Sequence, residues 1–177
     1  MTALDRWVER HRLSRWEMSE VLHELSRITP VRTVLEIGTH VGDSLRIWRE
    51  CLDPVRMVGV QDTDETPQGT AGAKIIRGRS QDPSVHRAVL GVLCNEDVDF
   101  LYIDGDHHYG PVRCDLDLYF PLVREGGICV LHDAALEGND TVEVFKLWPE
   151  VRKRWRTKLV WDGRPESRST GSGIVFR

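Results

Sequence analysis

Acidic and imidazole side chains gather in two short segments, and each segment directly follows an apolar run. Asp104-Gly-Asp-His-His-Tyr109 follows residues 98–103, and His132-Asp133 follows residues 128–131. Carboxylates suit a divalent cation such as Mg²⁺, which keeps several waters and takes few protein ligands. An imidazole titrates near neutral pH and can accept the proton of a hydroxyl group. If the two segments meet, we predict a centre for proton transfer that also holds a cation.

A glycine-containing segment follows an earlier apolar run, residues 33–37. Glu36-Ile-Gly38-Thr-His-Val-Gly42-Asp-Ser44 can turn tightly and approach a ligand closely, because glycine carries no side chain. The helix predicted behind it offers free N–H groups. A dinucleotide fingerprint needs glycine in place of His40, and the phosphate-binding triplet Gly-Lys-Ser/Thr does not occur. The pattern favours a nucleotide-like ligand, and the alternative is that the glycines only close a turn.

Short apolar runs alternate with helical spacings through the middle of the chain. Alternation of this kind predicts a parallel sheet covered by helices on both faces. Parallel strands end at one edge of the sheet, which would bring the segments above together. The last of the helices is expected to end at Gly126-Gly127. The predicted strands are 33–37, 57–60, 74–76, 98–103 and 128–131, and the predicted helices are 41–52, 83–93 and 112–123.

Both ends of the chain extend this core. Residues 3–27 show helical spacing within an N-terminal helical segment, 1–29, and residues 141–154 also favour a helix. Residues 158–161 and 173–176 predict two strands, antiparallel because the link between them is too short for a crossover helix. We therefore predict an α/β fold with a Rossmann-like, doubly wound seven-stranded sheet. The sheet is mostly parallel with an antiparallel C-terminal strand, in one domain, 1–177, whose α/β core is 30–177.

Composition excludes several classes of protein. The chain has 177 residues, of which 40% are hydrophobic, so one folded domain is expected rather than two or a disordered chain. A net charge of −4 argues against non-specific nucleic-acid binding. Neither a membrane-spanning run nor a secretory signal is found, so we expect a cytoplasmic protein. Its four dispersed cysteines, without a Cys-x-x-Cys pair, are expected to be reduced.

Three stretches together resemble class I S-adenosylmethionine-dependent methyltransferases: residues 34–44, 76–80, and 99–109 running on to 126–133. The chain is similar to the small metal-dependent O-methyltransferases, in the subgroup with cephalosporin-hydroxylase-like proteins and macrolide-sugar O-methyltransferases. The resemblance covers residues 33–133. It implies S-adenosyl-L-methionine as cofactor and methyl transfer to a hydroxyl of a small molecule, with a natural-product sugar as the expected acceptor.

The resemblance also implies which residues hold the cofactor. The acid that grips the ribose usually ends the second strand, where Gln61 stands and Asp62 follows, so Asp62 takes this role or is a plain turn former. Ser80 matches the position near the adenine. Asp104 is expected to border the cofactor as well. The residues expected beside the methionine part are Glu36, Gly38, Thr39, Gly42 and Ser44.

The same resemblance assigns the chemistry. His107, three residues after Asp104, would be the base, and Asp104, His132 and Asp133 would bind the divalent cation. His132 takes a place normally held by an acid. Because imidazole is more at home with Mn²⁺, Fe²⁺ or Zn²⁺ than with Mg²⁺, the identity of the ion stays open, and so does its presence.

Plainer interpretations remain for neighbouring residues. Asp104-Gly-Asp106 is also ordinary turn chemistry. His40 either touches the substrate or fills a loop position, and His108 is equally open. Asp115, on the helix that follows, is predicted to lie on a solvated face.

Two other functions compete with methyl transfer. One is an NAD-type oxidoreductase, disfavoured by the missing middle glycine and by Gln61 at the end of the second strand. The other is a non-catalytic, methyltransferase-like partner subunit, disfavoured by the retained Asp104, His107 and Asp133. The predicted core uses nearly the whole chain, so the site for a small-molecule hydroxyl is expected to be open or shared in a homo-oligomer.

Overall fold

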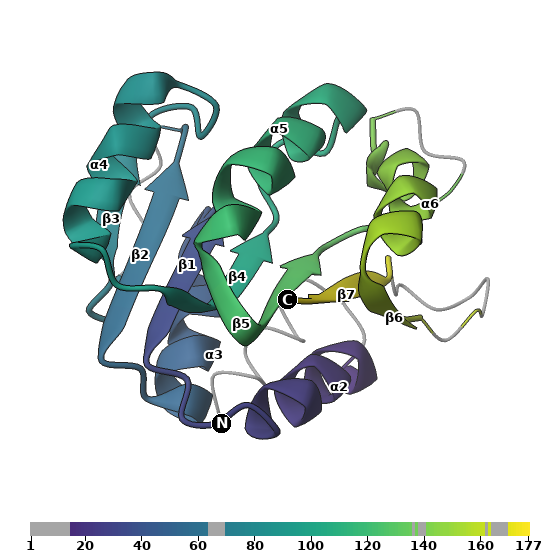
Figure 1. Cartoon of the computed structure of the whole chain (residues 1–177), viewed down its shortest axis with the longest axis horizontal. Coiled ribbons are helices and arrows are strands. Elements are labelled where there is room, and N and C mark those ends of the chain that lie inside the picture. Colours follow the sequence, from purple (N-terminus) through teal and green to yellow (C-terminus); the bar gives the residue numbers. More distant parts are fainter. Residues whose placement is uncertain (1–14, 64–69, 136, 138–140, 162, 164–169) are drawn as a thin grey trace.

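A computed structural model describes residues 15–63, 70–135, 137, 141–161, 163 and 170–177. It contains a seven-stranded sheet in the order β3-β2-β1-β4-β5-β7-β6 (Figure 1). The strands are β1 Thr33–Ile37, β2 Arg56–Gln61, β3 Lys74–Arg77, β4 Val98–Ile103, β5 Val123–Leu131, β6 Arg156–Val160 and β7 Ser172–Phe176. The helices are α2 Arg15–Ser26, α3 Asp43–Leu52, α4 Pro83–Leu93, α5 Tyr109–Tyr119 and α6 Val144–Arg154.

The first five strands are parallel, and β7 runs antiparallel to both of its neighbours, β5 and β6. The predicted α/β, Rossmann-like fold with an antiparallel C-terminal strand is confirmed. The strand order reverses between β1 and β4, so the chain leaves these two neighbouring strands in opposite directions across the sheet. Such a switch point leaves a crevice at the carboxyl ends of the strands.

Apolar side chains cover both faces of the sheet. Helices α4, α5 and α6 pack on one face, and α2 and α3 pack on the other (Figure 1). On the second face the fully buried Trp48 of α3 meets Phe100 edge-on, with ring centroids 4.9 Å apart. The central strands β1, β2 and β4 are buried on both sides, as expected for strands between two helical layers, whereas the edge strand β3 is partly exposed.

The predicted helix end at Gly126-Gly127 is wrong. Helix α5 stops at Tyr119, a 3₁₀ turn over Phe120–Leu122 follows, and β5 already begins at Val123. Pro121 accounts for the early stop because it cannot donate the next helical hydrogen bond. The two glycines lie inside β5, where its pairing with β4 shifts between Val98 and Phe100. The ladder between the two strands is irregular at this point.

The structure begins to describe the N-terminal helical segment at Arg15, so the predicted residues 3–14 lie outside it. Within the described residues, α2 extends from Arg15 to Ser26, and no helix is long and apolar enough to cross a membrane. The cysteines are all free, with Cys51 and Cys94 exposed, Cys114 half-buried and Cys129 buried.

Candidate active site

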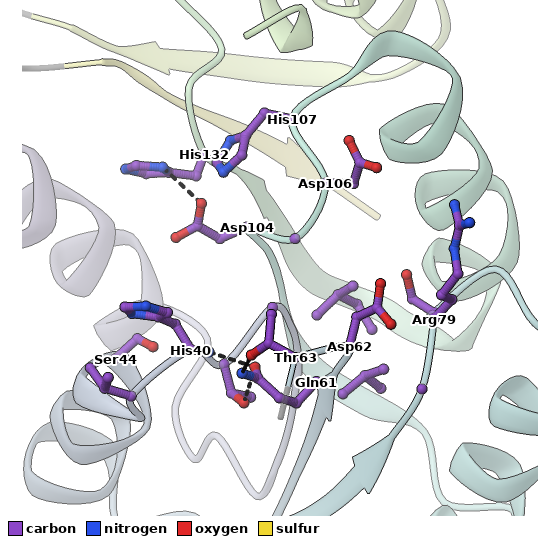
Figure 2. A pocket seen from close by; sticks show the side chains of 18 of the residues that line it. His40, Ser44, Gln61, Asp62, Thr63, Arg79, Asp104, Asp106, His107 and His132 are labelled. Carbon is purple, nitrogen blue, oxygen red and sulfur yellow. Dashed lines mark hydrogen bonds and ion pairs between the residues drawn. The ribbon is translucent and has the colours of Figure 1, made fainter. Parts of the chain in front are cut away.

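A cavity of about 530 Å³ opens at the carboxyl ends of the parallel strands. Its walls are the loops that follow β1, β2, β3 and β4, and His132 beyond β5 (Figure 2). The volume lies within the range of small-molecule sites, ~300–1,000 Å³. The cavity therefore occupies the switch point between β1 and β4, where the fold leads one to expect a ligand.

Gly38 brings the loops after β1 and β4 into direct contact. Its φ is 87°, and a Cβ at this position would collide with the main-chain carbonyl of Asp104. The Asp104 N–H donates to Ile37 O at 2.8 Å, and the Gly38 N–H donates to Val60 O at 2.9 Å. Glycine is required here both by the left-handed backbone and by the close approach.

Gln61 shapes the glycine loop from beneath. Its buried side chain accepts hydrogen bonds at Oε1 from Thr39 Oγ1 at 2.9 Å and from the His40 N–H at 2.7 Å. Its Nε2 donates to Thr63 Oγ1 at 2.6 Å. Gln61 is thus committed to the loop, whereas the next residue, Asp62, is exposed and lines the cavity.

Glu36 lies below the loop and is absent from the cavity wall, contrary to the expectation that it borders the cofactor. It is fully buried, and its carboxyl group accepts hydrogen bonds from Ser44 Oγ at 2.7 Å and Trp48 Nε1 at 2.6 Å. Burial raises the pKa of Glu36 to about 8, although these two hydrogen bonds oppose the shift. Glu36 on β1 therefore holds the first turns of α3, including Ser44, which does line the cavity.

Gly42 is also set back from the wall. It precedes α3 with a left-handed φ of 81° and turns the chain into the helix. The other residues predicted to hold the cofactor line the cavity: Gly38, Thr39, Ser44, Asp62, Ser80 and Asp104.

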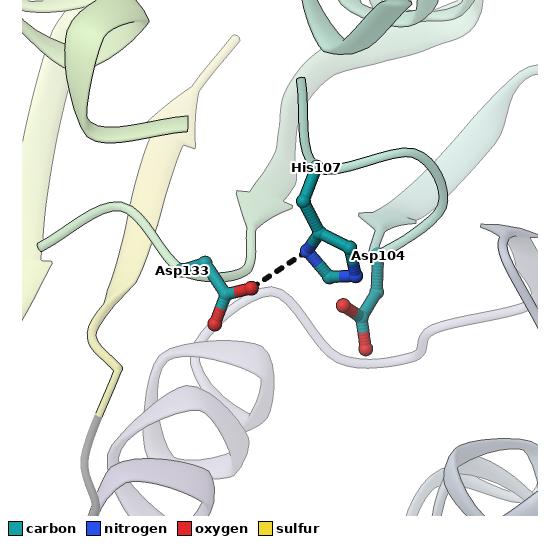
Figure 3. Close-up of side chains that lie close together, drawn as sticks. All are labelled: Asp104, His107 and Asp133. Carbon is teal, nitrogen blue, oxygen red and sulfur yellow. Dashed lines mark ion pairs between the residues drawn. The ribbon is translucent and has the colours of Figure 1, made fainter. Parts of the chain in front are cut away.

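Two aspartates and two histidines meet where β4 and β5 end. His107 Nδ1 lies 2.6 Å from Asp133 Oδ2 (Figure 3). His132 Nδ1 lies 3.0 Å from Asp104 Oδ1 (Figure 2) and 3.2 Å from Asp133 Oδ1. We call these four residues the Asp–His cluster. The sequence placed them at two strand ends, and the parallel sheet brings them together as predicted.

Contacts within the Asp–His cluster shift the pKa values of its members. The pKa of His107 is raised, first by its hydrogen bond to Asp133 and against the effect of burial. Burial alone would lower the pKa of His132, yet Asp104, Asp133 and Glu17 raise it to about 10. Burial would raise the pKa of Asp133, but the histidines and Thr170 lower it to about 2. An ionised Asp133 beside a protonated His132 is thus the favoured state near neutral pH.

Three groups of the cluster can converge on one ion. Asp104, His107 and Asp133 each offer a ligand atom, and these atoms lie within 4.8 Å of one another. The predicted set had His132 in place of His107. Both sets share the two carboxylates, and a mixed oxygen and nitrogen donor set suits a divalent cation.

The surrounding residues divide into those at the cavity and those away from it. His40 lines the cavity with a positive φ of 43°. His108 is exposed, and its Nδ1 lies 2.6 Å from Asp106 Oδ1. Asp115, predicted on a solvated face, is instead fully buried behind the loop after β3. That loop also contributes Gln81, which lines the cavity and which the sequence did not single out.

Residues 35–134 match a family model described as a methyltransferase domain. The chain belongs to this methyltransferase family. A protein of Mycobacterium sp. (strain JLS) that carries O-methyltransferase in its name is 32% identical over 134 residues, which are 67% of this chain and 56% of that protein. The chain spans about half the length of the curated relatives it matches.

Solved methyltransferase structures share the fold. MycE from the mycinamycin biosynthetic pathway, in complex with Mg, SAH and mycinamycin VI, is 19% identical with a TM-score of 0.69, covering 99% of this chain and 54% of MycE. The O-methyltransferase TomG from Streptomyces achromogenes, involved in tomaymycin synthesis and bound to SAM, is 17% identical with a TM-score of 0.64, covering 99% of this chain and 90% of TomG. At these identities the likeness concerns the fold.

Proposed function

We propose that this chain binds S-adenosylmethionine in the cavity and transfers its methyl group to a hydroxyl of a small molecule. The observation that carries the proposal is the continuity of the cavity, which joins the glycine loop after β1 to the Asp–His cluster. One end has the features of a nucleoside site, and the other has the groups for handling a hydroxyl proton. The sheet that positions both ends belongs to a domain of a methyltransferase family.

The cofactor would lie along the carboxyl ends of the strands. Gly38, Thr39 and Ser44 would border its methionine part, and Ser80 its adenine. Asp62 would accept hydrogen bonds from the ribose hydroxyls, since Gln61 is occupied by the glycine loop. When bound, the sulfonium supplies an electrophilic methyl group, so the main task of the protein is alignment.

His107 would act as the base. Its Nδ1 faces Asp133 Oδ2 at 2.6 Å, and this contact fixes the tautomer in which Nδ1 carries the proton (Figure 3). Nε2 then has the free lone pair that can accept a proton from the substrate hydroxyl. His107 is half-buried and lines the cavity, so a substrate can reach it.

A divalent cation would be held by Asp104 and Asp133, with His132 as the third ligand. His132 Nδ1 stands 3.0 and 3.2 Å from one oxygen of each carboxylate. Adjacent ligands of an octahedral ion with bonds of ~2.1 Å stand about that far apart. The bound ion would lower the pKa of a substrate hydroxyl. The alternative triad uses His107, which would then lose its role as base, so loss of Mn²⁺ affinity in His132→Ala but not in His107→Ala supports the first set.

The acceptor we propose is a hydroxyl of a natural product, such as a sugar. Support comes from MycE, whose complex contains mycinamycin VI, and from TomG, which is involved in tomaymycin synthesis. The side of the cavity beyond the Asp–His cluster would be completed by the acceptor itself or by a second copy of the chain.

Calorimetric titration tests the proposal. S-adenosylhomocysteine should bind with one site per chain, whereas NAD should give no saturable heat, because His40 replaces the glycine that a dinucleotide loop needs. Binding of NAD without S-adenosylhomocysteine would overturn the proposal in favour of an oxidoreductase.

A further inference from the structure

Asp115 is a buried acid that the reaction above does not use. It lies on α5, is fully buried, and accepts a hydrogen bond at Oδ1 from Gln81 Nε2 at 2.8 Å. Its Oδ2 has no hydrogen-bond partner among the described residues. Burial raises the pKa of Asp115 to about 6, against hydrogen bonds from Ser80 and Gln81. A buried carboxylate that is only partly satisfied by hydrogen bonds destabilises the fold.

The residues that Asp115 contacts belong to the cavity wall. Ser80 and Gln81 both line it, in the loop between β3 and α4. The backbone of this loop is anchored by Tyr119, whose hydroxyl donates to Ser80 O at 2.6 Å. Asp115 and Tyr119 stand one turn apart on α5, so a single helix fixes both the main chain and a side chain of the loop.

The hydrogen-bond count around Gln81 fixes the direction of its amide. Nε2 has two hydrogens, and it donates to Ser80 Oγ at 2.8 Å as well as to Asp115. An ionised carboxylate can only accept, so turning the amide around would set Gln81 Oε1 against Asp115 Oδ1. Both donors are therefore used inside the protein. Oε1 accepts no hydrogen bond from the described residues and is the polar atom that Gln81 offers to the cavity.

We propose that Asp115 is a positioning residue whose carboxylate orients Gln81 so that Oε1 accepts a hydrogen bond from the exocyclic amine of a purine base. This inference rests on the proposed function, which places the adenine beside Ser80. It adds a physical reason why the cavity would select adenine over hypoxanthine, in which a carbonyl replaces the amine. Two acceptors would then face each other, and the mismatch weakens binding.

Two ligands and two variants test this. S-adenosylhomocysteine and S-inosylhomocysteine are titrated into the wild-type chain, and the adenine ligand should bind more tightly by about tenfold or more. In Asp115→Asn the new amide can donate or accept, so the Gln81 amide is free to turn and the preference should shrink at least severalfold or reverse. In Gln81→Ala the acceptor is removed, and the two ligands should bind within about twofold of each other. Asp117→Asn is the matched control, because Asp117 is exposed on the same helix and should keep the wild-type ratio.

The wild-type chain offers a check that needs no variant. By NMR, both side-chain amide protons of Gln81 should be protected from solvent exchange before any ligand is added. Rapid exchange of both protons would overturn the inference even if Asp115→Asn failed to fold. A wild-type preference kept by folded Asp115→Asn and Gln81→Ala would also overturn it, while leaving methyl transfer intact. Failure of the wild type to bind either ligand would instead refute the proposed function.

Discussion

The two ends of the cavity are held in place by different forces. At the glycine-loop end, the main chain does most of the work: Gly38 has a left-handed φ, and Ile37 O receives the Asp104 N–H. At the Asp–His cluster, position depends on side-chain charge, as in the pair of His107 and Asp133. The first end cannot change without disturbing the junction of β1 and β4. Side chains of the Asp–His cluster can be substituted while the sheet remains intact.

The largest expected effect is at the junction itself. Gly38→Ala places a Cβ against the carbonyl of Asp104 and strains a backbone with φ of 87°. We expect a loss of about 3 kcal/mol or more in the free energy of unfolding, or failure to fold. Gly91→Ala on α4 is the control, because a Cβ there meets nothing within 4 Å, and it should be neutral or stabilising by up to ~1 kcal/mol. Urea denaturation measures both, and equal stabilities would contradict the account of this end.

At the Asp–His cluster, loss of the proposed base should lower activity without loss of cofactor binding. His107→Ala is expected to lower kcat by about 10²–10⁴-fold, the usual contribution of a general base, while the affinity for S-adenosylhomocysteine stays within about twofold. His108→Ala should leave both quantities unchanged, since His108 is exposed and paired with Asp106. A methyl-transfer assay over hydroxyl compounds supplies kcat, and calorimetry supplies the affinity. If both quantities dropped together in His107→Ala, the separation of the two ends would be wrong.

The buried Glu36 beneath the glycine loop makes the free energy of unfolding depend on pH. The folded chain holds its proton up to a pKa of about 8, whereas the unfolded chain loses it near 4.5, so the native state binds more protons between these values. This contribution is fully present below pH 4.5 and falls with rising pH by about 1.4 kcal/mol per pH unit until pH 8. Glu36→Gln removes the titration, so its stability relative to wild type should rise across that window. Urea melts from pH 5 to 8 measure the difference, and parallel curves would count against a buried, neutral Glu36.

The smallest effect is expected at an exposed contact. Asp62→Ala should weaken binding of S-adenosylhomocysteine by about tenfold, the value of one or two hydrogen bonds to a charged acceptor, without changing the melting temperature. Asp97→Ala, exposed at the opposite edge of the sheet before β4, should change neither quantity. Unchanged affinity in Asp62→Ala would remove Asp62 from the ribose site.

Much of this arrangement was predictable from local pattern. Apolar runs and helical spacing indicate the strands, and the rule that parallel strands end at one edge brings Asp104 to Asp133. Glu36 was predicted beside the cofactor, but its side chain points from β1 toward α3. The pleat of the strand sets this direction, and hydrogen bonds to Ser44 and Trp48 hold it. The burial of Asp115 was missed because its partner Gln81 is 34 residues away in the chain. Such partnerships arise only when separate elements pack.

A crystal structure with S-adenosylhomocysteine and Mn²⁺ tests the central claim most directly, because it locates both ends of the ligand at once. The account predicts the adenine beside Ser80, the ribose at Asp62 and the sulfur facing the Asp–His cluster, with the ion on Asp104 and Asp133. A ligand bound in the opposite direction, or outside the cavity, would contradict the account.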